Sequence, residues 1–203
     1  MVVVRPPEGQ DVGMERRFRS LSAEGTELLG QRLGAALWAG SVLTLDGDLG
    51  TGKTTLVRGL ARGLGIEEGV ASPTYTLMQQ HDGGRLPLFH FDAWMEGREK
   101  ALLADGADEF LGRGGVAVVE WAGRVEGWLP RPRLAVTLSH DTPETRYVTL
   151  RLVEDEHHEG GREGPFRALL AGFEAPEGVI EAGALGESHG SGEPDGPRPV
   201  EEP

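Results

Sequence analysis

The 203-residue sequence contains no cysteine. Disulfide bonds, thiol nucleophiles and cysteine-bound metal ions are therefore excluded. The sequence also lacks any apolar run near the roughly 20 residues that cross a bilayer. Its N-terminal stretch has no signal-peptide pattern. These absences predict a cytoplasmic protein with no membrane partner.

Asparagine is absent and lysine is scarce. Without asparagine the chain cannot form the Asn-Lys-x-Asp motif with which GTPases read guanine. Only Lys53 and Lys100 stand beside 18 arginines. Because arginine serves almost everywhere else as the cation, the lysine at position 53 indicates a need for a compact point charge.

The formal net charge of -13 is unevenly spread. Residues 154–203 carry -10 of it, so the acidity belongs to the C-terminal stretch and not to the rest of the chain. The overall balance shows no basic footprint of a nucleic-acid-binding protein. From residue 175 onward, Gly, Pro, Glu and Ser dominate, a composition that predicts disorder. We expect a flexible segment over 1–15, a folded domain over 16–174 and a disordered acidic tail over 175–203.

Hydrophobic periodicity places helices and strands alternately along the central part of the chain. The predicted helices are Ser22–Trp38, Thr54–Leu64, Arg98–Leu111 and Phe166–Phe173, with Ser22 as an N-cap. The predicted strands are Val42–Leu45, Leu86–Phe91 and Val116–Val119, followed by a hairpin of Leu134–Leu138 and Tyr147–Val153. This alternation favours an α/β fold with a mostly parallel central sheet and an antiparallel hairpin at one edge.

A phosphate-binding loop lies between the first predicted strand and the second predicted helix. Residues 47–54 fit the pattern G-x-x-x-x-G-K-[ST] at every required position. Glycines allow backbone N–H groups to point at phosphate oxygens, and the following helix adds the positive end of its dipole. We therefore predict a P-loop NTPase with a three-layer sandwich fold that uses ATP and Mg²⁺. Its ATP-binding residues would be Gly47, Asp48, Leu49, Gly50, Thr51, Gly52, Lys53, Thr54 and Thr55.

Two acids follow buried strands directly. Asp92 comes after Leu86–Phe91, and Glu120 comes after Val116–Val119. The carboxyl ends of strands are where ligands bind in open α/β sheets. One of these acids would hold Mg²⁺ together with the Thr54 hydroxyl, and the other would orient water or a second magnesium ligand. The predicted catalytic residues are thus Lys53, Asp92 and Glu120.

The segment Ser72-Pro73-Thr74-Tyr75-Thr76 has two interpretations. It lies where many P-loop enzymes carry a switch that senses the γ-phosphate, and it is equally consistent with an ordinary turn and strand. Trp121, which follows Glu120, either packs in the core or stacks on a base or a partner. His81 and His90 show no metal-ligand spacing, and we interpret them as structural or solvent-facing.

Several blocks together resemble the bacterial TsaE (YjeE) ATPase family. The resemblance is carried by Ser22–Gly30, Gly47–Gly59, Ser72–Leu77, His90-Phe91-Asp92, Val118–Ala122 and Leu129-Pro130. They come in the family's order and spacing and cover residues 20–152. The resemblance implies an ATPase that supports synthesis of N6-threonylcarbamoyladenosine at position 37 of tRNAs reading codons that begin with A.

The resemblance also implies partners and residue roles. TsaE would bind the TsaD–TsaB pair and reset it by ATP hydrolysis, so tRNA would be met through that complex. Thr54 and Glu120 would ligate Mg²⁺, and Asp92 would assist hydrolysis or the metal shell. Residues 72–76 would form the switch, and Trp121 would lie near the nucleotide.

One position departs from the family pattern, and two other functions remain open. After Asp92 the family usually has a Tyr-Arg pair, whereas this chain has Trp94-Met95, so it keeps the aromatic residue and lacks the arginine. A small-molecule or nucleotide kinase on the same scaffold is one alternative, although no arginine-rich lid stands out. A nucleotide-gated binding module with negligible turnover is the other.

Overall fold

The computed structural model describes residues 14–67, 69–95, 97, 110–111, 114–154 and 164–182. The helix predicted over 98–111 falls almost wholly outside these residues, as does most of the predicted 1–15 segment. Within the described part of the chain, no helix is both long and apolar enough to cross a membrane.

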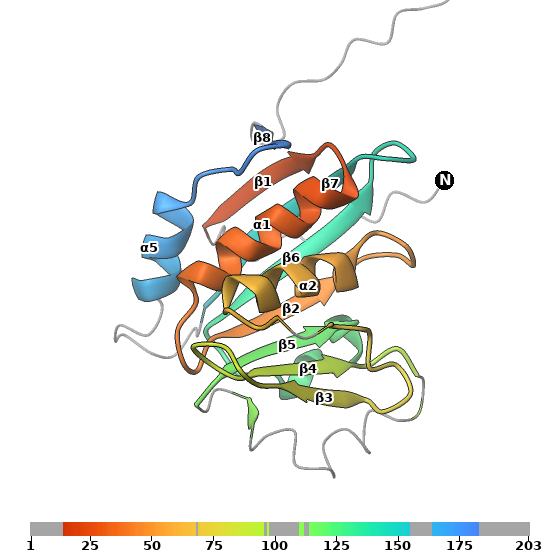
Figure 1. Cartoon of the computed structure of the whole chain (residues 1–203), viewed down its shortest axis with the longest axis vertical. Coiled ribbons are helices and arrows are strands. Elements are labelled where there is room, and N and C mark those ends of the chain that lie inside the picture. The colour runs from red at the N-terminus through yellow and green to blue at the C-terminus, as the bar shows by residue number, and fades with distance from the viewer. Residues whose placement is uncertain are drawn as a thin grey trace, which may run out of the picture.

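A single eight-stranded sheet runs through the molecule in the order β3-β4-β5-β2-β6-β7-β1-β8 (Figure 1). The four central strands β4, β5, β2 and β6 are parallel, and the flanking pairs are antiparallel. The predicted α/β fold is thereby confirmed. The strands are β1 Glu15–Ser20, β2 Val42–Asp46, β3 Met78–His81, β4 Leu88–Asp92, β5 Val116–Glu120, β6 Arg133–His140, β7 Arg146–Val153 and β8 Val179–Ala182.

The sheet separates two apolar cores because successive side chains of a strand point to opposite faces. On β5, Val116 and Val118 belong to the larger core, while Ala117 and Val119 belong to the smaller one. All four are at most 1% exposed, which is why this strand reads as a continuous apolar run.

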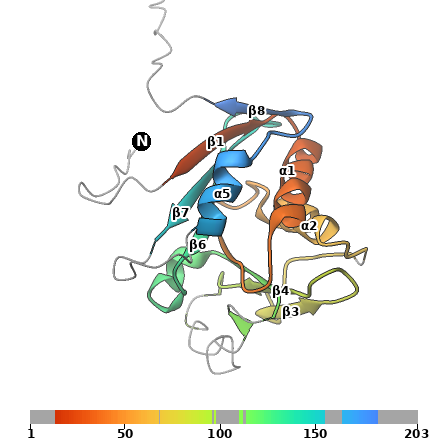
Figure 2. The ribbon, with the colours of Figure 1, turned by 90° about the vertical axis from the view of Figure 1, so that its left-hand side faces the viewer.

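The larger core is covered by the helices α1 Ala23–Ala36, α2 Lys53–Gly63 and α5 Gly164–Gly172, which lie on one side of the sheet (Figure 2). Ser22 caps α1 as predicted, since its hydroxyl accepts a hydrogen bond from the N–H of Gly25. A Cβ at Gly30 of α1 would lie 2.2 Å from the Leu56 carbonyl oxygen of α2, so glycine allows the two helices to touch. This contact fixes α2, and with it the phosphate loop, against the sheet.

The smaller core lies on the opposite face, against β2, β4 and β5. Two short 3₁₀ segments follow β5 there, η1 Ala122–Arg124 and η2 Glu126–Trp128. Ala122 and Val125 bury their side chains in this core. The turn directly after β5 is therefore held to the sheet, next to the carboxyl ends of the parallel strands.

The far edge of the sheet is formed by two strands that were not predicted. The predicted hairpin of β6 and β7 does not lie at that edge, because β1 pairs with β7 and β8 pairs with β1.

The predicted disorder from residue 175 onward is wrong for the first part of the tail. Val179 is buried there, and the Leu21 N–H donates to the Gly178 carbonyl. The rest of the predicted tail, residues 183–203, lies outside the described residues.

Candidate functional site

The phosphate-binding pattern forms a loop between the end of β2 and the start of α2. All three of its glycines have positive φ that other residues rarely adopt, 140° at Gly47, 76° at Gly50 and 99° at Gly52. Gly52 is the N-cap of α2, and its left-handed conformation lets the helix begin at Lys53. The loop therefore directs the N-terminal end of α2 toward the carboxyl edge of the parallel strands, as the motif requires.

Lys53 is folded back into its own loop. Its Nζ atom donates to the carbonyl oxygens of Gly47 at 2.7 Å and Asp48 at 2.9 Å, and the residue is 5% exposed. Desolvation lowers the pKa of Lys53, while the carboxylates of Glu120 and Asp92 act in the opposite direction. The ammonium group thus occupies a partly desolvated position among acids and carbonyls, where its attraction for an anion is stronger than it would be in water.

Trp121 covers the same ammonium group. The Nζ atom lies 3.7 Å from the centre of the Trp121 ring, and that ring packs on Trp94 with centroids 4.3 Å apart. Trp121 has φ of 60°, and its N–H donates to the carbonyl of Leu45 on β2. This constrained backbone turns the ring back over the loop, which fits the expectation that Trp121 lies beside the site.

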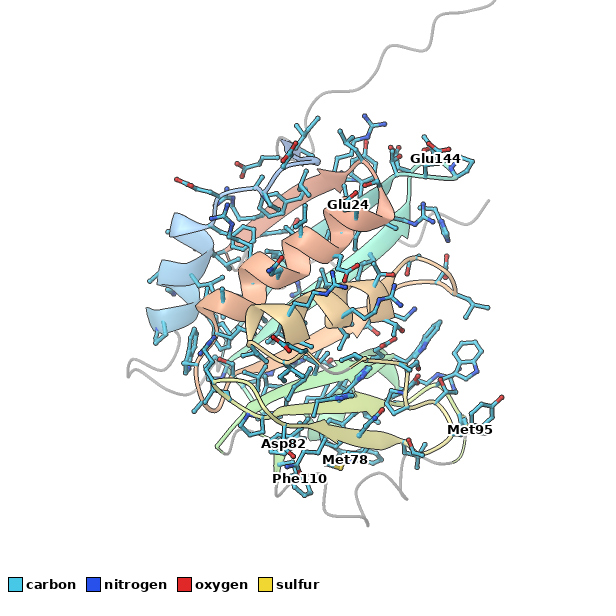
Figure 3. All side chains as sticks on the ribbon, viewed as in Figure 1. Glu24, Met78, Asp82, Met95, Phe110 and Glu144 are labelled. Carbon is cyan, nitrogen blue, oxygen red and sulfur yellow. The ribbon has the colours of Figure 1, made fainter. Side chains whose placement is uncertain are left out.

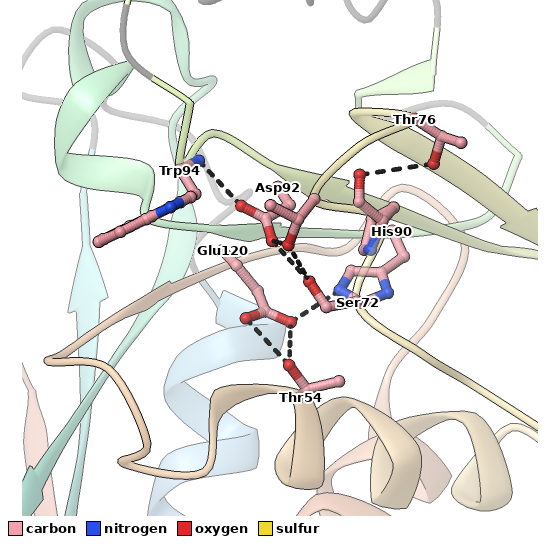
Figure 4. A network of polar contacts seen from close by, with 9 residues as sticks. Thr54, Ser72, Thr76, His90, Asp92, Trp94 and Glu120 are labelled. Carbon is pink, nitrogen blue, oxygen red and sulfur yellow. Dashed lines mark hydrogen bonds and ion pairs between the residues drawn. The ribbon is translucent and has the colours of Figure 1, made fainter.

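Glu120 is joined to two side chains from different elements (Figure 4). The Thr54 hydroxyl donates to its two carboxylate oxygens at 3.0 and 3.3 Å. The Nε2 atom of His90 lies 2.9 Å from Oε1 of the same carboxylate. Glu120 is 2% exposed, so a buried carboxylate stands directly against the first turn of α2.

Asp92 has its own set of donors (Figure 4). The hydroxyls of Ser72 and Thr74 donate to Oδ2 at 2.6 and 2.8 Å, and the N–H of Trp94 donates to Oδ1 at 2.8 Å. Asp92 pairs with Glu120 in the register of β4 and β5. The two acids predicted from separate strand ends therefore lie side by side, and the predicted switch segment is attached to one of them.

One pocket of about 430 Å³ collects most of the predicted site residues. It is lined by Leu49, Gly50, Gly52, Lys53, Thr54, Thr55, Ser72, Thr74, Asp92, Trp94, Glu120 and Trp121. Other predicted site residues, including Thr51, Tyr75 and Thr76, do not line this pocket. Thr51 is buried with its hydroxyl on the Asp48 carbonyl, while Tyr75 is 84% exposed. The Thr76 hydroxyl donates to the Pro73 carbonyl within its own turn.

A second pocket of about 330 Å³ lies on the other side of the loop and was not foreseen from the sequence. It is bounded by the start of α1, the loop and the β6–β7 turn, and its lining includes Ser22, Thr26, Thr55 and Arg146. Figure 3 shows Glu24 of α1 and Glu144 of that turn at the same end of the molecule. No local pattern could reveal this pocket, because its walls meet only in the folded chain.

The oxygen groups around Thr54 fit a magnesium ion. No cluster of three or more His, Asp or Glu side chains able to hold a metal occurs among the described residues. Mg²⁺ needs no such cluster, since it takes one or two protein oxygens and completes its shell with phosphate oxygens and water. The adjacent Thr54 hydroxyl and Glu120 carboxylate offer such a pair of hard oxygen ligands.

Comparison with known proteins identifies the family of this chain. A family model described as threonylcarbamoyl adenosine biosynthesis protein TsaE matches residues 20–148. The chain belongs to the TsaE family. Among TsaE relatives, the protein of Bacillus subtilis is 38% identical over 142 residues, which are 70% of this chain and 88% of the relative.

Other TsaE relatives come from distant bacteria. The protein of Treponema pallidum is 39% identical over 134 residues, 66% of this chain and 98% of its own length. In three dimensions the chain resembles the crystal structure of Bacillus subtilis YdiB with a TM-score of 0.66 and 31% identity. That similarity covers 80% of this chain and 97% of YdiB.

Proposed function

We propose that this chain is a Mg²⁺-dependent ATPase that serves tRNA threonylcarbamoyladenosine biosynthesis by acting on the TsaD–TsaB complex. Membership of the TsaE family supports the biosynthetic role. The observation that carries the ATPase proposal is the single pocket in which Lys53, Thr54, Asp92 and Glu120 meet. That set contains one cation for phosphates, two oxygen ligands for a metal and a second carboxylate.

Binding of the phosphates would reorganise Lys53. Its ammonium group now satisfies the carbonyls of Gly47 and Asp48. A triphosphate in the loop offers anionic acceptors, which form stronger hydrogen bonds than neutral carbonyls do. Lys53 would move to the β- and γ-phosphates, while the N–H groups at the start of α2 bind phosphate oxygens.

Mg²⁺ and Asp92 would both act at the γ-phosphate. Thr54 and Glu120 would hold Mg²⁺, which neutralises charge on the β- and γ-phosphates when bound. Asp92 lies next to Glu120 in the sheet and would accept a hydrogen bond from the attacking water. Because Ser72 and Thr74 donate to the same Oδ2 atom, a water bound there would compete with the switch segment for Asp92.

The nucleoside would occupy the second pocket. Thr55 and Gly52 line both pockets, so a ligand whose phosphates fill one can extend around the loop into the other. The chain cannot form the guanine-reading Asn-Lys-x-Asp motif, because it has no asparagine. Adenosine is therefore the proposed nucleoside.

Phosphate release from ATP by the purified chain tests this function. Turnover should require Mg²⁺ and should change when TsaD and TsaB are added. Lys53→Ala should reduce it by about 100-fold or more, the scale for losing a charged group that stabilises the transition state. A normal rate in the Lys53→Ala protein would contradict the site assignment.

A cellular experiment tests the biological part separately. In bacteria lacking this protein, the wild-type chain should restore threonylcarbamoyladenosine in tRNA, and the Lys53→Ala chain should not. Nucleotide binding without measurable turnover, alone or with TsaD–TsaB, would instead favour a nucleotide-gated binding module. Transfer of phosphate to a small acceptor molecule would favour a kinase.

A further inference from the structure

A histidine lies inside the sheet between apolar residues of its own strand and the next, with the buried ring of His81 centred 6.2 Å from its own. His90 is the middle residue of β4 and is 0% exposed. Leu88 precedes it on the same face of β4, and Val118 lies opposite it on β5. Packing alone would be served by another leucine or valine here, and burying an imidazole costs free energy unless its polar atoms are bonded. The position therefore calls for an explanation beyond core filling.

The polar contacts of His90 point to one partner. Its Nε2 atom lies 2.9 Å from Oε1 of Glu120, whereas its Nδ1 atom has no hydrogen-bond partner among the described residues. An ionised carboxylate cannot donate, so Nε2 carries the hydrogen and donates to Oε1. The one hydrogen bond that the ring makes is directed at the acid beside Thr54.

We propose that His90 is a positioning residue that orients Glu120 for magnesium. This inference rests on the proposed ATPase function. By holding Oε1, the imidazole would fix the plane of the carboxylate beside the Thr54 hydroxyl, which lies 3.0 Å from Oε1 and 3.3 Å from Oε2. Histidine and carboxylate groups behind metal ligands play this part in other proteins, where their loss costs about 10- to 100-fold in metal affinity or activity.

The two acids of the site, Asp92 and Glu120, accept hydrogen bonds from different donors. Asp92 takes its hydrogen bonds from Ser72, Thr74 and the Trp94 N–H, and none from His90. Loss of the imidazole should therefore affect the metal ligand and leave the donors of Asp92 in place. A purely structural role predicts the reverse pattern, a less stable protein with unchanged metal binding.

Three variants of the full chain distinguish these roles. His90→Leu fills the space without a donor, and His90→Gln restores an N–H donor. Val118→Ala is the matched control, because it loosens the packing opposite the ring and leaves the hydrogen bond to Glu120 intact. The readout is binding of Mn²⁺, used in place of Mg²⁺, measured by the EPR signal of the free ion with ADP present.

The expected result is a 10- to 100-fold weaker Mn²⁺ affinity in His90→Leu, partial recovery in His90→Gln and wild-type affinity in Val118→Ala. The affinity for ADP in EDTA should stay within about two-fold in all three, since His90 does not line the nucleotide pocket. Equal Mn²⁺ affinity in wild type and His90→Leu would overturn the inference. If His90→Leu does not fold, His90→Met, which also lacks an N–H donor, takes its place. An Mn²⁺ affinity at least about 10-fold weaker than that of Val118→Ala then supports the role, and equal affinity overturns it.

Failure of the proposed function would look different. In that case the wild-type chain would bind neither ADP in EDTA nor Mn²⁺ in the presence of ADP. Wild-type binding of both, with no effect of His90→Leu, would leave the ATPase proposal intact and remove only the role of His90.

Discussion

The ammonium group of Lys53 lies 3.7 Å from the centre of the Trp121 ring while it donates to two carbonyls of its own loop. The aromatic ring and the carbonyls are weaker partners for a cation than phosphate oxygens are. In this arrangement the lysine that would bind ATP is held by groups that a triphosphate can replace. The position of its Nζ atom is therefore the feature most directly linked to nucleotide binding.

ATP binding should change the fluorescence of Trp121. Withdrawal of a cation from the ring face alters the surroundings of the indole, so we expect a change in emission that saturates with ATP. Trp121→Phe should remove most of this change, and Trp94→Phe should retain it. Titration of the two variants checks this prediction, and an undiminished response in Trp121→Phe would contradict it.

The Thr54 hydroxyl should be required for the use of magnesium. Thr54→Val keeps the shape of the side chain but removes the group that contacts Glu120, so ATP turnover should fall by about 10- to 100-fold. Thr54→Ser keeps the hydroxyl and should stay within a few-fold of wild type. Steady-state rates over a range of Mg²⁺ concentrations make the comparison, and similar rates in the valine and serine variants would argue against the assignment.

Gly47 and Gly50 should differ in their tolerance of alanine. A Cβ at Gly47 would lie 2.2 Å from the Leu138 carbonyl oxygen, and φ there is 140°. Gly50 also has positive φ, 76°, but nothing lies within 4 Å of its added Cβ. We expect Gly47→Ala to cost at least about 3 kcal/mol of folding free energy and Gly50→Ala about 1–2 kcal/mol. Urea denaturation measures both, and equal costs would show that the close contact with Leu138 is unimportant.

Asp46 should make stability depend on pH. Burial raises the pKa of Asp46 and repulsion from Glu126 adds to this, although the Gly123 N–H bond to Oδ1 acts against it. Its ionised form is thus less favourable in the folded chain than in the unfolded one, and this penalty is present above the folded pKa and absent below the ordinary value of 3.8.

Asp46→Asn removes the charge and keeps an oxygen acceptor for Gly123. The variant should have a higher melting temperature than wild type at pH 7. This difference in melting temperature should become smaller as the pH falls toward 3.8. Thermal denaturation followed by circular dichroism at several pH values tests this. A gap that widens on acidification would contradict the sign of the effect.

The sequence predicted the centre of the molecule better than its edge. The apolar strands that end in Asp92 and Glu120 are local patterns, and parallel pairing then places both acids at one end of the sheet. Strand β1 escaped prediction because its side chains are mostly charged and only Phe18 enters the apolar core. Strand β8 is short, and its order depends on the neighbouring edge of β1.

Contacts between side chains that are distant in the sequence could not be predicted either. His90 was interpreted as structural or solvent-facing, since its spacing shows no metal-ligand pattern. Its bond to Glu120 joins residues 30 positions apart and exists only when β4 pairs with β5. The attachment of Ser72 and Thr74 to Asp92 is of the same kind, and it gives the predicted switch segment a specific partner.

A crystal structure with Mg²⁺ and a non-hydrolysable ATP analogue tests the central claim most directly. The triphosphate should lie inside residues 47–55, with Lys53 Nζ moved from the Gly47 and Asp48 carbonyls to the β- and γ-phosphates. The metal should lie beside Thr54 and Glu120. An analogue bound elsewhere, with Lys53 still on those carbonyls, would contradict it.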